Sequence, residues 1–255
     1  MRWLRKSGES GEAKAIVVLM ISSVLLAAVP AVGAPNWAIY ADATIEDGDE
    51  YHIIEVYDSL TAPPVQTTVT MTGGLVTALS AYETSIVNIS GGSFANGVGS
   101  FDYSSIYFSG TAYSPGLGVY EYGTGWVSGG SIGFLEARDS GTVNLTGVSI
   151  AEYVLATGSD SLAINIYGTD FFYDSLAGNY GGGRLSGNWP GGTAFSIDFY
   201  ATDAPGGAPV DSYSYVVLHI VPEPSTFALL GTGGLFLKKR YCLSLLLAFS
   251  CVIVV

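Results

Sequence analysis

The chain has 255 residues, of which 34 are glycine and 17 tyrosine, and a formal net charge of −13 at pH 7. This length gives room for one sizeable domain plus targeting signals, and the composition favours turn-rich β structure over helix. Between residues 34 and 221 there are 19 acidic and two basic side chains, a formal net charge of −17. Such a surface repels nucleic acid and anionic lipid, so the sequence predicts no nucleic-acid partner.

Residues 1–33 have the pattern of a secretory signal peptide. Four basic side chains precede an apolar run, Ala15–Ala28, and the small residues Ala31-Val32-Gly33 follow it. This order of a positive region, a short apolar region and a small-residue cleavage site predicts export, with cleavage after Gly33. An uncleaved anchor helix is the alternative, although the run is short for a bilayer span.

Residues 34–68 are expected to cap the first coil of the repeat region that follows. Tyr51–Tyr57 alternates enough to be a strand, and Pro63-Pro64 interrupts the chain before the first clear repeat. The densest acidic run is Glu46-Asp47-Gly48-Asp49-Glu50. It is interpreted as a solvated turn, with a calcium site as the alternative, because it lacks the ligand spacing of known calcium loops.

Residues 69–220 contain a short repeat in which each unit ends at a glycine. The seven glycines are Gly73, Gly91, Gly110, Gly129, Gly147, Gly168 and Gly187. Two and four residues before each glycine, twelve of the fourteen side chains are apolar and the other two positions are glycine. One and three residues before it, none is aliphatic. Alternation with period two is typical of a half-buried strand.

A nearly constant spacing of similar strands is typical of a solenoid, in which each coil stacks on the one before. The predicted fold class is therefore all-β, a parallel β-helix or β-solenoid with coils of about 18–19 residues, plus an N-terminal signal helix and a C-terminal membrane helix. An all-β sandwich is the alternative, because it also contains regular short strands. A sandwich would not require constant spacing.

The side chains three residues before each glycine are expected to form an outward column. They are Thr70, Asn88, Tyr107, Trp126, Asn144, Asn165 and Arg184. Tyr107 and Trp126 fall on adjacent coils, with Tyr167 nearby in the neighbouring column. Exposed aromatic faces beside Asn and Ser suit sugar rings, which makes these three residues a possible carbohydrate face. The alternative is that the rings only stack on each other as strand neighbours.

Catalytic side chains are sparse in this sequence. The only histidines, His52 and His219, are expected near opposite ends of the solenoid, and lysine is absent between residues 34 and 221. Asp139 and Asp160 fall in what look like equivalent turns, so a stacked carboxylate pair could serve as acid and base. No metal-ligand spacing, phosphate loop or nucleophile elbow is present. The chain is therefore predicted not to be an enzyme and to need no cofactor or metal.

The C-terminal part has an ordered, three-part pattern. Pro222-Glu223-Pro224 is followed by an apolar Gly/Leu-rich stretch and then by Lys238-Lys239-Arg240. This arrangement at residues 221–240 resembles the PEP-CTERM sorting signal of Gram-negative bacteria. The resemblance implies export, retention in the membrane by the C-terminal helix, recognition of Pro-Glu-Pro by the membrane protease exosortase, and an association with exopolysaccharide and biofilm.

The tail departs from that pattern in two ways. Its apolar stretch, Thr226–Leu237, has twelve residues, whereas a span needs about twenty. Residues 241–255 then add a second apolar stretch, which leaves open whether the anchor is processed efficiently.

The sequence thus predicts an exported structural or adhesive protein, membrane-anchored or at the cell surface, with exosortase as a partner and extracellular polysaccharide as a possible one. A carbohydrate-binding module and a polysaccharide-degrading β-helix enzyme are the alternatives.

Overall fold

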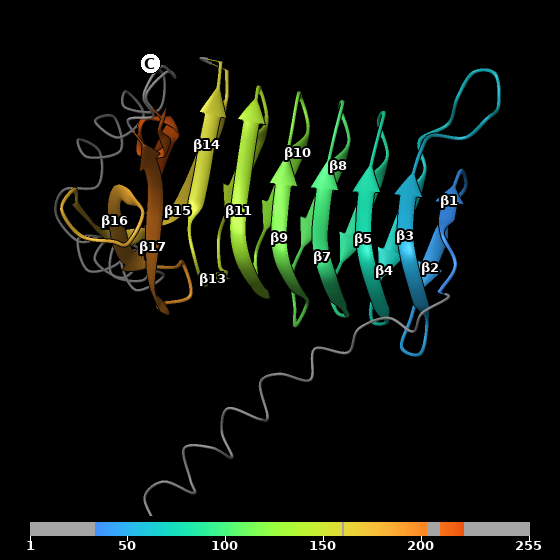
Figure 1. The fold of residues 1–255 in the computed structure, drawn as a ribbon, viewed down its shortest axis with the longest axis horizontal. Helices are drawn as coiled ribbons and strands as arrows, with labels where there is room; N and C mark the ends of the chain where they lie inside the picture. The colour runs from blue at the N-terminus through green and yellow to red at the C-terminus, as the bar shows by residue number, and fades with distance from the viewer. Residues whose placement is uncertain (1–33, 160, 203–209, 222–255) are drawn as a thin grey trace, which may run out of the picture.

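A computed structural model describes residues 34–159, 161–202 and 210–221. These residues form a rod of stacked coils, and each coil gives one strand to each of two parallel sheets that lie face to face (Figure 1). The all-β solenoid predicted from the sequence is confirmed, and the sandwich alternative is wrong because neighbouring coils pair in parallel. The signal segment, the sorting segment and the last fifteen residues lie outside the described residues, and so do the two expected terminal helices.

One sheet, called here the long-strand sheet, runs along one face of the rod. Its parallel strands lie side by side in chain order (Figure 1). They are β1 (Trp37–Ile39), β3 (Glu50–Val56), β5 (Leu75–Ala81), β7 (Ser93–Ser100), β9 (Tyr113–Val119), β11 (Ser131–Asp139), β13 (Ser149–Ile150) and β14 (Val154–Gly158). β13 and β14 both pair with β11, and β14 pairs in parallel with β17 (Ala194–Thr202) at the end of the rod.

The opposite sheet, called here the short-strand sheet, holds the second strand of each coil. These strands are also parallel. They are β2 (Ala43–Ile45), β4 (Thr68–Met71), β6 (Ile86–Ile89), β8 (Ser105–Phe108), β10 (Thr124–Val127), β12 (Thr142–Leu145), the first part of β15 (Ala163–Asp174) and β19 (Val216–Ile220).

The register of the short-strand sheet reproduces the glycine spacing of the sequence. Val69 pairs with Val87, Val87 with Ile106 and Ile106 with Gly125, and each of these residues lies four positions before its corner glycine. Glycine is required at the corners because the backbones of successive coils approach closely there. A Cβ on Gly91, for example, would overlap with the carbonyl oxygen of Thr72 in the coil before.

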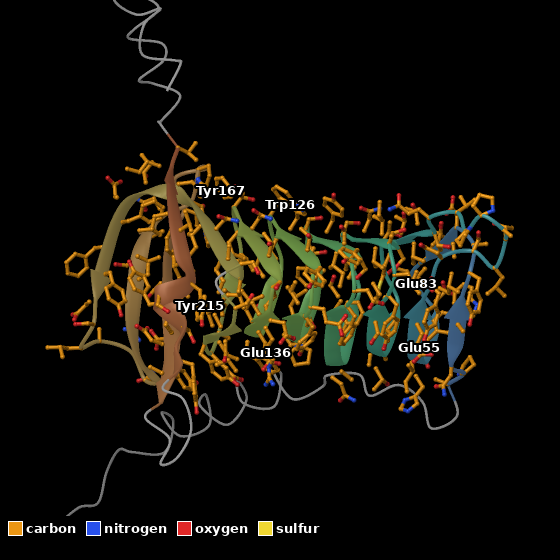
Figure 2. All side chains as sticks on the ribbon, turned by 90° about the horizontal axis from the view of Figure 1, so that it is seen from above. Glu55, Glu83, Trp126, Glu136, Tyr167 and Tyr215 are labelled. Carbon is orange, nitrogen blue, oxygen red and sulfur yellow. The ribbon has the colours of Figure 1, made fainter. Side chains whose placement is uncertain are left out.

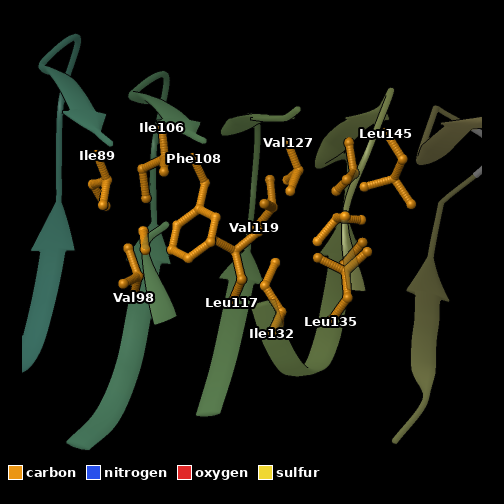
Figure 3. Packing of buried hydrophobic residues seen from close by; sticks show 14 of the residues in the cluster. Ile89, Val98, Ile106, Phe108, Leu117, Val119, Val127, Ile132, Leu135 and Leu145 are labelled. Atoms are coloured by element: carbon orange, nitrogen blue, oxygen red, sulfur yellow. The ribbon is translucent and has the colours of Figure 1, made fainter. Parts of the chain in front are cut away.

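The core lies between the two sheets and is continuous along the rod. Ile106 and Phe108 from β8 point toward Leu117 and Val119 from β9, and the same pattern continues in the next coils (Figure 3). These four side chains have no exposed surface. The positions two and four residues before each corner glycine are therefore the buried face, as the alternation predicted.

The solenoid begins earlier than the boundary at residue 69 that the sequence suggested. β2 pairs with β4, and β3 pairs with β5, so residues 34–68 supply coil strands of their own. The first step of the short-strand sheet, from Ala43 to Val69, is longer than the later ones because the loop around Pro63-Pro64 is inserted before β4. Because this step is longer than the later ones, the constant spacing of the glycines does not extend to the earlier coils.

The seventh predicted repeat is not a coil. Gly187 lies in β16 (Gly181–Asn188), which pairs antiparallel with the second half of β15 and with β17 (Ala194–Thr202). β18 (Val210–Asp211) and a 3-10 helix, Ser212–Tyr215, lead into β19, which pairs with β15 in parallel. The last coil of the short-strand sheet is thus reached only after a hairpin insertion.

Candidate carbohydrate face and sorting motif

The column on the short-strand sheet has the predicted register over six coils, but Asn144 within it is buried, with 5% of its surface exposed. Strand pairing aligns Thr70, Asn88, Tyr107, Trp126, Asn144 and Asn165 one above the other. The next partner is Val217, not Arg184, because Arg184 belongs to the antiparallel hairpin. The predicted face therefore ends one coil earlier than the spacing suggested.

Tyr107 and Trp126 form the exposed aromatic part of this column. Each is 41% exposed, their ring centroids are 6.5 Å apart, and their planes differ by 5°. They point outward because their neighbours Ile106 and Phe108 on the one strand, and Val127 on the other, point into the core. Two nearly parallel rings, stepped along the rod, present an apolar strip to solvent.

Tyr167 lies on the same face of the rod as Trp126 but does not extend this strip (Figure 2). Its ring stacks on His219, with centroids 4.4 Å apart and planes 13° apart. Between the two aromatic pairs lie amide side chains: Nδ2 of Asn165 donates to Oδ1 of Asn144 at 3.1 Å, and Nε2 of His219 donates to Oδ1 of Asn165 at 3.0 Å. The predicted site is thus two aromatic pairs separated by a hydrogen-bonded amide ladder.

A second aromatic column, which the sequence reasoning missed, lies where the long strands end. Five rings stack coil on coil with centroids 4.9–5.4 Å apart. They are Tyr40, Tyr57, Tyr82, Phe101 and Tyr120. Its sequence signal is an aromatic residue followed by Asp or Glu at the coil spacing, as in Tyr82-Glu83, Phe101-Asp102 and Tyr120-Glu121.

In four successive coils an acidic residue at the end of the long strand makes the turn between the two sheets. Glu83, Asp102, Glu121 and Asp139 have φ between 54° and 59°, in the left-handed region. Each of the first three carries a hydrogen bond between coils: the carboxylate of Glu121 accepts from the N–H of Asp102, that of Asp102 from Glu83, and that of Glu83 from Asp58. The acidic column therefore binds adjacent turns together.

The aromatic column ends where Arg138 takes the place of a ring. The hydroxyl of Tyr120 donates to Glu136 at 2.7 Å, and Nε of Arg138 donates to the same carboxylate at 2.7 Å. Burial raises the pKa of Tyr120 well above its usual range, and the hydrogen bond to Glu136 adds to that increase. Tyr120 thus stays neutral and keeps this contact over the whole physiological pH range.

The proposed carboxylate pair and the acidic run take other arrangements. Asp139 pairs with Gly158 on the next coil, and residue 160 lies outside the described residues. In the acidic run, Asp49 N–H donates to the carbonyl of Glu46, and the Asp49 carboxylate accepts from Glu46 N–H, which closes a turn. Among the described residues no group of three or more His, Cys, Asp or Glu side chains could hold a metal ion.

The segment after the last strand carries a known sorting motif. Residues 221–240 match the PEP-CTERM protein-sorting motif. No curated protein and no solved structure is similar to this chain. The match covers the predicted sorting residues Pro222, Glu223 and Pro224 and the basic cluster Lys238, Lys239 and Arg240, all of which lie outside the described residues.

The motif indicates where the protein is located. A PEP-CTERM signal implies an exported protein at the cell envelope that is processed by exosortase. In the described part of the chain, no helix is long and apolar enough to cross a membrane. The chain is therefore an exported β-solenoid with a sorting signal directly after its last strand, β19.

Proposed function

We propose that this protein is a structural or adhesive component of the cell envelope or extracellular matrix, associated with exopolysaccharide or biofilm, and that it has no catalytic activity. The observation that carries the proposal is a rod with a continuous aliphatic core whose last strand leads directly into a sorting motif. A solenoid of this kind offers a long surface built from repeated positions, which suits contact with extended partners.

The surface chemistry supports a passive scaffold. Aromatic and acidic columns run from coil to coil and are used to hold the coils together. His52 and His219 lie on β3 and β19, in the second and last coils, so no imidazole stands beside the acidic turns of the middle coils in the described part of the chain. A polysaccharide-degrading enzyme stays the least favoured alternative, and turnover of acidic polysaccharides by the purified protein would establish it.

Carbohydrate binding is the second candidate function, and the exposed Tyr107–Trp126 strip favours it. Nearly parallel rings can stack under successive sugar rings, while the partly exposed amide of Asn88 lies in the same column to accept or donate hydrogen bonds at the edge. Under this proposal the rod would hold extracellular polysaccharide along its short-strand face, and PEP-CTERM sorting would place that face outside the cell.

The test uses the protein in a host that has exosortase. The full chain should be found in the envelope or matrix fraction, and a chain ending at residue 220 should pass into the medium, with less biofilm mass. Equal distribution and equal biofilm mass of the two chains would contradict the structural proposal.

The carbohydrate candidate has its own matched pair of variants. Trp126→Ala should reduce retention on the host's exopolysaccharide by about tenfold, the scale of one lost anchoring side chain. Phe172→Ala removes an aromatic ring that is 65% exposed on the hairpin and should leave retention unchanged. Equal retention of Trp126→Ala and Phe172→Ala would reject the Tyr107–Trp126 strip as a sugar site.

A further inference from the structure

The regular stacking of corners stops after the coil that contains Gly147. In the preceding coils the first residue of each long strand donates its N–H to a corner carbonyl one coil below: Ser93 to Gly74, Tyr113 to Gly92, Ser131 to Ala112 and Ser149 to Gly130. In the described residues, no long strand of a further coil donates such a hydrogen bond to the carbonyl of Val148. The reason is that the chain after Gly168 continues into the hairpin and does not form another corner of the same kind. β13 (Ser149–Ile150) correspondingly pairs only with β11.

The tip of the β16–β17 hairpin covers this gap. Gly192 N–H donates to the carbonyl of Trp189 and Trp189 N–H donates to the carbonyl of Thr193, each at 2.8 Å. Pro190 takes the second position of the turn, and Gly192 has φ of 81°. This is a three-residue hairpin loop with a type I turn and a left-handed glycine. It fixes Trp189, which stacks on Phe195 with centroids 4.2 Å apart.

A cavity of 640 Å³ lies between the hairpin tip and the unpaired corner. Its size falls within the range of about 300–1,000 Å³ of small-molecule sites. Trp189 and Phe195, which are only 6% and 8% exposed, contribute a small apolar area to its lining, and Ser128, Thr146, Ser149 and Ser196 supply hydroxyl groups. The unpaired upper edge of β13 adds backbone donors and acceptors.

We infer that this cavity binds a neutral sugar ring. Its lining contains no charged side chain among the described residues, although the described surface is strongly acidic, so neither an anion nor a cation is matched there. Several hydroxyls beside a small apolar area match a ligand with many hydroxyl groups and an apolar ring face. A peptide added as a strand is disfavoured, because β13 offers an edge of two residues only.

The cavity is next to the Tyr107–Trp126 strip but is a separate site. Ser128 follows Trp126 by two residues, about 7 Å along an extended chain. A single sugar ring can occupy the cavity without touching the strip, so this inference does not depend on the proposed function. If both sites bind, a glycan lying on the strip would have its end beside the cavity.

The experiment uses the full chain in a zwitterionic detergent that has no sugar headgroup. Glucose, galactose, mannose and N-acetylglucosamine are titrated by ligand-observed NMR, with glucuronate and glucosamine as charged comparators. At least one neutral sugar should bind, and the charged ones should bind more weakly. Absence of binding by all four neutral sugars, or equal binding of the charged ones, would overturn the inference.

Variants then locate the binding. Ser196→Leu fills the cavity and should weaken binding by at least about tenfold, the scale on which a filled pocket rejects a ligand. Ser175→Leu, at an exposed serine outside the cavity lining, is the matched control and should bind like the wild type. Gly191→Leu is a second variant, because Gly191 lines the cavity and a Cβ there meets no atom within 4 Å that would oppose folding.

Trp126→Ala separates this site from the aromatic strip. It should leave binding of the single sugar unchanged while it reduces retention on polysaccharide. If a folded Ser196→Leu or Gly191→Leu protein, checked by circular dichroism, binds the sugar as tightly as the Ser175→Leu control, the cavity is not the site.

Discussion

The middle coils and the hairpin end of the rod bury apolar side chains in different ways. From β4 to β12 the coils are nearly equal in length, and each position contacts its own counterpart in the next coil. Between β15 and β19 the chain makes a long excursion through the hairpin before it returns to the same sheet. That excursion is held by its own antiparallel strand pairing, by buried side chains such as Leu185 and Phe199, and by single contacts such as Arg184–Asp198. Repeated contacts therefore stabilise the middle coils, whereas an antiparallel hairpin with contacts that do not repeat stabilises the end.

The largest expected effect is the loss of a core ring from the middle coils. Phe108 has no exposed surface and is surrounded by core side chains of β8 and β9 (Figure 3). Phe108→Ala should lower the free energy of unfolding by about 3–5 kcal/mol because it leaves a cavity between coils. Phe172→Ala, on the exposed face of the hairpin, should change it little. Urea denaturation measures the free energy of unfolding of both variants. Equal losses would contradict the difference between the middle coils and the hairpin.

Corner glycines should be less tolerant than the hairpin-tip glycine. A Cβ on Gly91 would overlap with the Thr72 carbonyl oxygen, so Gly91→Ala should destabilise by about 1–3 kcal/mol through overpacking. Gly191→Ala has open space and should stabilise by about 0.4–1 kcal/mol. Thermal unfolding should therefore show a lower melting temperature for Gly91→Ala and a higher one for Gly191→Ala than for the wild type. A melting temperature of Gly91→Ala that equals or exceeds that of the wild type would show that the corners are not closely stacked.

The aromatic column should contribute less per ring than the core. Tyr82 stacks between Tyr57 and Phe101 with centroids 5.0 and 5.1 Å away. Tyr82→Leu keeps the apolar bulk but loses both stacking contacts, which should reduce stability by about 1 kcal/mol. Tyr103→Leu, which loses a single partner and is 65% exposed, is the control and should cost less. The free energy of unfolding is measured by urea denaturation. A larger loss for Tyr103→Leu than for Tyr82→Leu would contradict the role of the column.

The smallest expected effect is a pH dependence at the hairpin. Hydrogen bonds from Arg184 hold the pKa of Asp198 below its usual range, the N–H of Asn179 adds to this, and burial opposes it. A depressed folded-state pKa contributes stability above the unfolded value of about 3.9, and this contribution is lost as the pH falls through the folded value.

Asp198→Asn should therefore lower the melting temperature near pH 6, and the difference from the wild type should shrink as the pH falls below about 4. Melting curves from about pH 3 to pH 7 measure that difference. A difference that stays constant over this range would contradict the assigned role of the carboxylate.

The contrast also explains how much could be predicted from the sequence. The spacing of Gly91, Gly110 and Gly129 predicted the coils and their buried positions because, in a solenoid, register follows directly from period. Gly187 carries the same local pattern, yet it lies in an antiparallel strand. Period-two alternation is common to parallel and antiparallel strands, so local sequence could not distinguish them.

The site was predicted in part for the same reason. Tyr107 and Trp126 followed from register, whereas the stacking of Tyr167 on His219 depends on a residue beyond the whole hairpin insertion. The cavity at Trp189 forms where the hairpin interrupts the repeat, so the spacing of the repeat could not predict it. The column of Tyr82 and Phe101 did have a signal, the repeated aromatic-acidic pair, and a search for dipeptides at the coil spacing would have found it.

The central claim is that an exported rod is delivered to the cell surface by its sorting motif. The most direct test is the intact mass of the mature protein from the surface fraction of its own host. A C-terminus close to Pro224, just after the last strand, is the result this account predicts. A chain that still extends to Val255 would contradict it, since the motif would then not be processed.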